Sequence, residues 1–148
     1  NVGTRLRKLD EGQFSALILA AAGLERLGLR ARVSRYFSLD EIVPAPGQGI
    51  LACQGRAGDK NEDWLDAIFD PDATDCARAE RAFSAALGGG CASPVGACAR
   101  LHGGEMKLTG FFADESRGLK LRASLTGRRE EARRLGEMLA EKILREAR

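Results

Sequence analysis

The sequence VGACARLHGGEMKLTGFFA, residues 95–113, is typical of a β-hairpin. Two apolar-rich segments, Val95–His102 and Glu105–Ala113, flank the dipeptide Gly103-Gly104. Two glycines between such segments are a common signal for a two-residue turn that joins antiparallel strands. The pattern therefore predicts two paired strands in the C-terminal half of the chain.

The residues that follow the hairpin predict a third strand and a closing helix. Between 119 and 126 apolar and polar side chains alternate, which is typical of a half-buried strand. From Gly127 to Arg148 the pattern changes to that of an amphipathic helix. Its apolar stripe consists of Ala132, Leu135, Leu139 and Ile143.

A second helix is predicted ahead of the hairpin. It opens at Pro71, with Asp72 or Thr74 as its cap, and ends at Gly88. Its apolar residues recur at helical spacing: Cys76, Ala79, Phe83, Ala86 and Leu87. Residues 71–148 thus predict a helix, three strands and a helix, an α+β domain with helices covering one face of an antiparallel sheet.

The first part of the chain predicts a different, α/β organisation. Residues 4–11 are expected to form a short polar helix that closes near Gly12. The apolar run Ser15–Ala20 predicts a strand buried on both faces, and residues 21–28 predict a helix ended by Gly28. A buried strand followed at once by a helix is half of a βαβ unit.

The middle of the chain is expected to be less regular. Pro44-Ala45-Pro46-Gly47-Gln48-Gly49 predicts a loop because two prolines and two glycines prevent regular structure. Ile50–Gln54 is a candidate strand, and Asn61–Phe69 is expected to be helical.

Charge is distributed unevenly along this chain of 148 residues, whose net charge is only +2. Residues 1–35 carry seven basic and three acidic side chains, whereas residues 59–80 carry eight acidic and two basic ones. The basic N-terminal part indicates an anionic ligand. Nucleic acid is disfavoured because aromatic residues make up only 5% of the sequence. No apolar run approaches the ~20 residues of a membrane span.

Four cysteines and a single histidine limit the metal chemistry that the chain can support. The cysteines contain no C-x-x-C pair, so no metal site is predicted. We interpret Cys53, Cys76 and Cys98 as small buried apolar groups of a reduced, cytoplasmic protein. The chain begins at Asn1 rather than at a methionine, which we interpret as a piece of a longer protein.

Cys91 stands apart because it follows three consecutive glycines, Gly88-Gly89-Gly90. A glycine run of this kind costs conformational entropy and indicates unusual backbone geometry or close approach. No histidine lies nearby to act as a base, and the end of a helix does not lower a thiol pKa. An exposed thiol that reacts once with a strong electrophile fits this setting, as does a cysteine that is incidental to a tight turn.

Two arginines bracket the predicted buried strand. Arg5 precedes it and Arg26 lies in the helix after it, where α/β sheets form ligand crevices. Arginine can bind a carboxylate there with two parallel hydrogen bonds, although single arginines often lie only on solvated helix faces. The Gly47-Gln48-Gly49 turn presents backbone N–H groups and one side-chain amide. It could bind an anion or simply reverse the chain, so it is weaker evidence for a site.

Four motifs together resemble the hydroxymethylbilane synthase family, also called porphobilinogen deaminase. They occur in the family's order and spacing and extend over nearly the whole chain: NVGTRL (1–6), LAAAGLERLG (19–28), PAPGQG (44–49) and LGGGCASPVG (87–96). The resemblance implies the C-terminal half of a three-domain enzyme.

In this family's arrangement, residues 1–43 would be the C-terminal part of a second domain with a periplasmic-binding-protein-like α/β fold. Residues 44–70 would return to the first domain. Residues 71–148 would form the third domain, which carries the cofactor cysteine.

The resemblance also implies a transferase of tetrapyrrole and haem biosynthesis. Four porphobilinogen units would be added to a dipyrromethane cofactor, each with loss of ammonia, before hydroxymethylbilane is released. By matching positions, Cys91 would hold the cofactor as a thioether, and Arg5 and Arg26 would bind its carboxylates. Gln48, Leu19 and Ala20 would line the site.

The family's catalytic aspartate belongs to the first domain and has no counterpart in this sequence. We therefore predict no catalytic residue here, and no turnover by these residues alone. The expected partners are porphobilinogen and the N-terminal half of the same protein, in a full-length monomer without nucleic acid or membrane. Two other interpretations stay open: a non-catalytic, arginine-lined module for small carboxylates with unmodified Cys91, and a purely structural domain.

Overall fold

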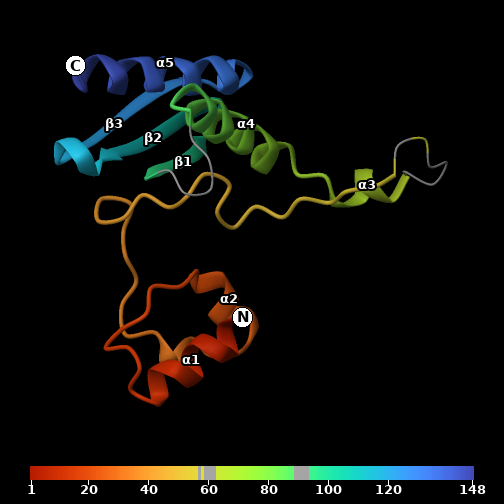
Figure 1. The fold of residues 1–148 in the computed structure, drawn as a ribbon. Coiled ribbons are helices and arrows are strands. Elements are labelled where there is room, and N and C mark those ends of the chain that lie inside the picture. Colours follow the sequence, from red (N-terminus) through yellow and green to blue (C-terminus); the bar gives the residue numbers. More distant parts are fainter. Residues whose placement is uncertain (57, 59–62, 89–93) are drawn as a thin grey trace. The chain divides into compact units, whose positions relative to one another are not determined.

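A computed structural model of the chain describes residues 1–56, 58, 63–88 and 94–148 (Figure 1). It divides into two units, Asn1–Ser38 and Leu39–Arg148. The prediction at Cys91 falls outside the described residues.

The larger unit contains a three-stranded antiparallel sheet in the order β1-β2-β3. The strands are β1 (Val95–His102), β2 (Glu105–Asp114) and β3 (Leu119–Arg128). His102 pairs with Glu105 across the turn, and Gly103 has a φ of 63°, which only glycine adopts without strain. The predicted hairpin and the third strand are confirmed.

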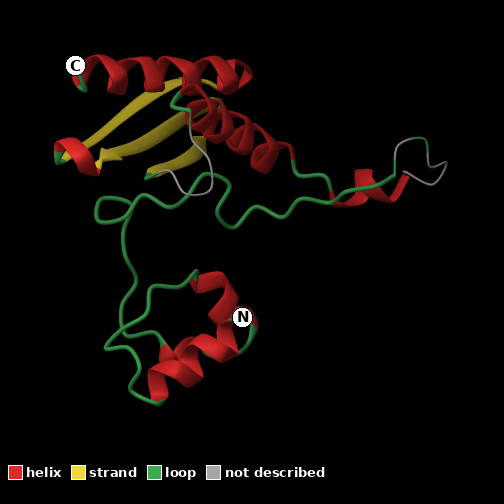
Figure 2. Cartoon of the chain, viewed as in Figure 1, coloured by secondary structure: helices red, strands yellow, loops and turns green. Residues whose placement is uncertain are grey.

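Two helices, α4 (Pro71–Ala86) and α5 (Ala132–Glu146), pack against each other and against the same sheet (Figure 2). The largest fully buried side chains come from all of these elements: Phe83, Met106, Leu108, Leu139 and Ile143. The predicted apolar stripe of the last helix, from Ala132 to Ile143, is buried as expected. The predicted α+β domain is therefore confirmed for the described residues.

The two helices approach very closely at Gly136 of α5. A Cβ atom built there would lie 2.3 Å from the Ala79 carbonyl oxygen and 2.8 Å from the Phe83 backbone nitrogen. Atoms of the backbone cannot move aside as a flexible side chain can. Gly136 is thus the residue that allows α5 to lie on α4.

Two element ends differ from the prediction. The cap of α4 is Asp70, one turn before Thr74, and its carboxylate accepts a hydrogen bond from the Ala73 N–H at 3.0 Å. Proline at the first helical position leaves the preceding residue extended, so Asp70 takes the capping place. The last helix begins at Ala132 rather than Gly127, because β3 continues to Arg128 and a 3₁₀ turn follows.

The smaller unit is built from α1 (Val2–Asp10), α2 (Ala21–Arg26) and a 3₁₀ turn, Arg30–Arg32. The two helices agree with the prediction, and Gly28 follows α2 with a φ of 69°. Leu6 and Leu24 are the buried hydrophobic residues of this unit. Its core is therefore very small.

The predicted strands at Ser15–Ala20 and Ile50–Gln54 are wrong. Neither segment has strand structure, and Ile18 and Leu51 are 68% and 76% exposed. An apolar run becomes a buried strand only when neighbouring strands satisfy its backbone groups, and the described residues of either unit supply no such neighbour.

The remaining middle segment follows the prediction in outline. Pro44–Gly49 forms turns, and α3 (Asp63–Ile68) lies inside the predicted helix 61–69. Residues 61 and 62 lie outside the described residues. The mixed class of helices with an antiparallel sheet is thus confirmed, whereas the periplasmic-binding-protein-like fold of residues 1–43 and the three-domain division stay predictions.

None of the helices in the described part of the chain is both long and apolar enough to cross a membrane.

Candidate functional site

Arg5 and Arg26 lie on α1 and at the last position of α2, and both are exposed. Among the described residues, neither forms an ion pair. Arg7, by contrast, pairs with Glu11 at 2.7 Å, and Arg32 pairs with Asp10. The two arginines that were predicted to bind carboxylates therefore keep their guanidinium groups available for an anion.

Leu19 and Ala20 lead directly into α2. Ala20 is the N-cap residue and its carbonyl accepts a hydrogen bond from the Gly23 N–H at 3.1 Å. Leu19 is half-buried and Ala20 is exposed. Since α1 touches α2 where Val2 faces Gly23, the structure places four predicted site residues in one small unit.

Gln48 belongs to the other unit, in the turn between Ala45 and Ile50. Gly47 and Gly49 have φ angles of 74° and 84°, and the Gln48 N–H donates to the Ala45 carbonyl at 3.0 Å. The Gln48 side chain is exposed. A turn of this kind holds the backbone of Gln48 in place and leaves its side-chain amide exposed.

Cys91, the predicted attachment point, lies among residues 89–93, outside the described residues. The described chain reaches it from Gly88, which follows α4 with a φ of 68°, and leaves it at Pro94 before β1. The other three cysteines are free thiols. Their predicted burial is wrong for Cys53, which is exposed, and only partly right for Cys76 and Cys98, which are half-buried.

One buried group escaped the sequence prediction. Glu80 lies on the sheet side of α4 and is only 5% exposed. Its carboxylate accepts one hydrogen bond from the Ala99 N–H at 2.8 Å and another from the Gly47 N–H at 2.7 Å. The available signal was a charged residue inside the apolar stripe of α4, one turn after Cys76 and next to Ala79, where carboxylates are rare.

Glu80 changes the titration of its surroundings. Burial raises the pKa of the Glu80 carboxyl, and the two backbone hydrogen bonds oppose that shift. Burial also raises the pKa of the Cys76 and Cys98 thiols, and the nearby Glu80 charge adds to the effect. The raised pKa values favour the protonated, less reactive form of both thiols.

Residues 40–44 cross the sheet face that the helices leave open. At one end Arg122 of β3 donates to the Asp40 carbonyl at 2.7 Å and to its carboxylate at 2.9 Å. At the other end the Ala97 N–H donates to the Pro44 carbonyl at 2.9 Å. A Cβ built on Gly96 would lie 2.7 Å from the Val43 carbonyl oxygen, so glycine is required there for this close passage.

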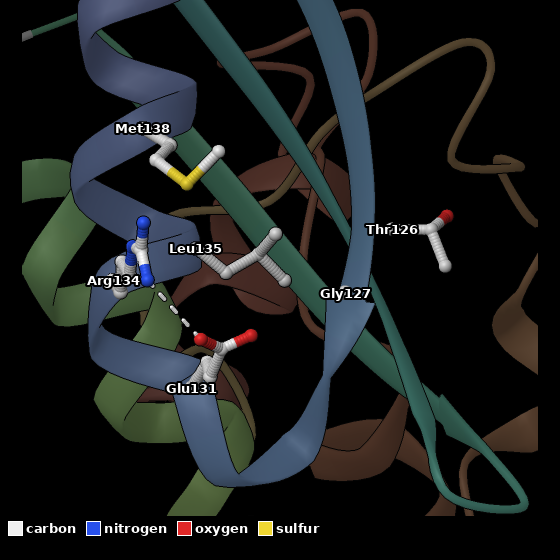
Figure 3. Close-up of a pocket in the computed structure, with 6 residues that line it drawn as sticks. All are labelled: Thr126, Gly127, Glu131, Arg134, Leu135 and Met138. Carbon is white, nitrogen blue, oxygen red and sulfur yellow. Dashed lines mark hydrogen bonds and ion pairs between the residues drawn. The ribbon is translucent and has the colours of Figure 1, made fainter.

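A shallow hollow of about 210 Å³ lies between the end of β3 and the start of α5 (Figure 3). Leu135 and Met138 project into it from the helix, whereas Thr126 points away. Arg134 and Glu131 pair with each other at its rim at 3.3 Å. None of the predicted site residues that the structure describes lines it. Among the described residues, no cluster of three or more metal-binding side chains occurs.

Together these features define a mixed α and β protein with two exposed arginines on its smaller unit and a tethered turn at residues 46–49 on its larger unit. Two family models match the chain along most of its length. One is described as "porphobilinogen deaminase, dipyromethane cofactor binding domain" and matches residues 1–63. The other is described as "porphobilinogen deaminase, C-terminal domain" and matches residues 74–145. The chain belongs to the porphobilinogen deaminase family.

Curated relatives carry the same name. The porphobilinogen deaminase of Ruminiclostridium cellulolyticum is 46% identical over 97% of this chain and 48% of its own length. The proteins of Acetivibrio thermocellus and Thiobacillus denitrificans are 47% and 48% identical, over 99% and 97% of this chain and 50% and 47% of their own lengths. The chain thus spans about half the length of the curated relatives it matches.

Proposed function

We propose that this chain is the C-terminal part of a hydroxymethylbilane synthase, a transferase of tetrapyrrole biosynthesis. The supporting observation is that two models of one family match residues 1–63 and 74–145 in order. In the proposed reaction, four porphobilinogen units are joined in turn with loss of ammonia, and hydroxymethylbilane is then released.

The residues of this chain would hold the dipyrromethane cofactor in two ways. Cys91 would attach it covalently through a thioether. Arg5 and Arg26 would bind its carboxylates, and their exposure and lack of ion pairs among the described residues fit that role. Gln48, Leu19 and Ala20 would line the site. The bound cofactor would supply the primer on which the pyrrole chain grows.

Comparison of the four cysteines supports Cys91 as the attachment site. Burial raises the pKa of Cys76 and Cys98, which makes both thiols weaker competitors for an electrophile. Cys53 is exposed but lies outside all four family motifs. Cys91 is the remaining thiol, and it lies in the LGGGCASPVG motif (87–96), one of the four on which the family resemblance rests.

The proposal is tested by measuring the intact mass of the full-length protein that contains this chain. A pyrrole-specific colour test is made on the same sample. We expect a mass excess equal to two linked pyrroles, which disappears in Cys91→Ser and persists in the matched control Cys53→Ser. An excess that survives Cys91→Ser would contradict the attachment site. An unmodified, colourless protein would instead favour the non-catalytic carboxylate-binding module.

The 148 residues alone are expected not to turn over porphobilinogen. The reason is that the family's catalytic aspartate has no counterpart in this sequence, while the buried carboxylate Glu80 is already occupied by two backbone N–H groups. Ammonia release is the measurement, with the full-length protein as positive control. Porphobilinogen-dependent ammonia release by the isolated chain would contradict this prediction. We further propose a cytoplasmic, monomeric full-length protein whose N-terminal half completes the site.

A further inference from the structure

β1 lies at one edge of the three-stranded sheet, so every second N–H group along it faces away from β2. An open edge of this kind invites unwanted pairing unless it is covered. Here the Ala97 N–H donates to the Pro44 carbonyl and the Ala99 N–H donates to Glu80. The edge is therefore covered jointly by residues 44–47 and by a side chain of α4.

Glu80 also reaches the covering segment itself. One carboxylate oxygen, Oε1, accepts from Ala99, and the other, Oε2, accepts from Gly47. Among the described residues no basic side chain pairs with Glu80, so these two backbone N–H groups are its partners there. A buried carboxylate that uses both oxygens in this way joins a helix, a strand and a loop at one point.

We propose that Glu80 is a positioning residue that fastens the Gly47-Gln48-Gly49 turn to the open edge of β1. Gln48 is the next residue after the anchored Gly47, so the anchor sets where its side-chain amide lies within the unit Leu39–Arg148. The role assigned to Gln48 rests on the proposed function. The anchor itself rests only on the two hydrogen bonds and the burial of Glu80.

Amide hydrogen exchange of this 148-residue chain tests the anchor directly. In the unaltered chain we expect the Gly47 and Ala99 amides to exchange at least about tenfold more slowly than in an unstructured peptide. Gly47 lies in a loop, and its amide has no other acceptor among the described residues. Unprotected exchange at Gly47 would overturn the proposal without any variant.

Glu80→Gln keeps the size of the side chain but leaves only one acceptor oxygen. We expect one of the two amides to exchange about tenfold faster or more, while the amide of fully buried Leu139 is unchanged. Glu105→Gln, which alters an exposed glutamate on the same sheet, is the matched control and should change neither. Unchanged exchange at both Gly47 and Ala99 in a folded Glu80→Gln protein would overturn the anchor. If Glu80→Gln unfolds the chain, protection of Gly47 in the unaltered chain decides.

A double-mutant cycle in the full-length protein separates positioning from general stability. If Glu80 acts through Gln48, the Glu80→Gln and Gln48→Ala variants should each lower kcat. The kcat of the double variant should then be no lower than that of the less active single variant. Additive losses would overturn the link to Gln48. Unchanged kcat in both single variants would also overturn the link to Gln48. A full-length protein that is colourless and shows no turnover would count against the proposed function, while the exchange result would still decide the anchor.

Discussion

Side chains of one type differ in reactivity in this molecule because their surroundings differ. Three of the four cysteines are described, and they differ in exposure: Cys53 is exposed, whereas Cys76 and Cys98 are half-buried near Glu80. Because the thiolate is the reactive form, a raised pKa and reduced access act in the same direction. Local environment, and not residue type, therefore ranks these thiols.

Alkylation with iodoacetamide at pH 8 in a Cys91→Ser background should follow that ranking. We expect Cys53 to react at least about tenfold faster than Cys76 or Cys98, because burial raises the pKa of the latter two. Peptide mass mapping over time gives the three rates. Equal alkylation rates for the three thiols in the folded protein would contradict the prediction.

Asp114 is a carboxyl group whose pKa depends on its local hydrogen bonds. Its carboxylate accepts hydrogen bonds from the Ser116 hydroxyl at 2.6 Å and from the Ser116 and Arg117 N–H groups at 3.0 and 3.3 Å. The Ser116 hydroxyl in particular lowers the pKa of Asp114 below its ordinary value of 3.8. A carboxyl with a lowered folded pKa stabilises the fold above its unfolded pKa, and the benefit is lost as pH falls through the folded value.

The effect of Asp114→Asn on unfolding should therefore depend on pH. We expect the variant to be less stable than the unaltered chain above pH 3.8, with the difference disappearing on further acidification. Urea unfolding across this range measures it, and Ser116→Ala should raise the pKa of Asp114 seen by NMR. A difference that grows as the pH falls would contradict the assignment.

At the scale of elements, the fold depends on how closely α4 and α5 approach. Gly136 meets the backbone of α4, where a Cβ would lie 2.3 Å from the Ala79 oxygen. Alanine at an ordinary helix position stabilises by roughly 1 kcal/mol relative to glycine. Here the clash with fixed backbone atoms should outweigh that gain.

We expect Gly136→Ala to lower the free energy of unfolding by about 1–3 kcal/mol, because the helices must separate to admit the methyl group. The measurement is urea unfolding followed by circular dichroism. Gly104→Ala is the control, since a Cβ at Gly104 would meet nothing within 4 Å. A Gly136→Ala protein as stable as the unaltered chain would show that the two helices do not require this contact.

For the whole molecule, the two units differ greatly in the core that each can bury. Residues 1–38 contribute Leu6 and Leu24, whereas the larger unit buries the remaining core side chains, with Phe83 and Leu139 fully enclosed. Units below about 40 residues seldom hold their fold without further support. The larger unit should therefore carry nearly all of the chain's resistance to unfolding.

Hydrogen exchange over the whole chain should show this difference. Amides of α1 and α2 are expected to exchange at least about a hundredfold faster than those in the centre of α5. The comparison is made within one sample, so solvent conditions are identical. Equal protection in both units would mean that residues 1–38 gain stability from contacts beyond their own small core.

Much of the larger unit could be predicted because its signals are local. Glycines at Gly103-Gly104, strict alternation in β3 and the apolar stripe of α5 each follow from the geometry of one element. The element ends were less predictable, since Asp70 and Asp72 are equally good caps and only the position of Pro71 separates them. The strand predicted at 15–20 failed because a strand depends on partners elsewhere in the chain.

The amino-acid sequence by itself determined the helix, hairpin and strand pattern of residues 71–148 and the family to which the chain belongs. Only the tertiary structure showed that Glu80 joins α4, β1 and the turn at Gly47, and that Gly96 and Gly136 allow close passage. The physical reason is the separation along the chain over which each kind of interaction acts. Helix and strand patterns repeat over a few neighbouring residues, whereas a hydrogen bond between positions 33 residues apart leaves no periodic trace in the chain.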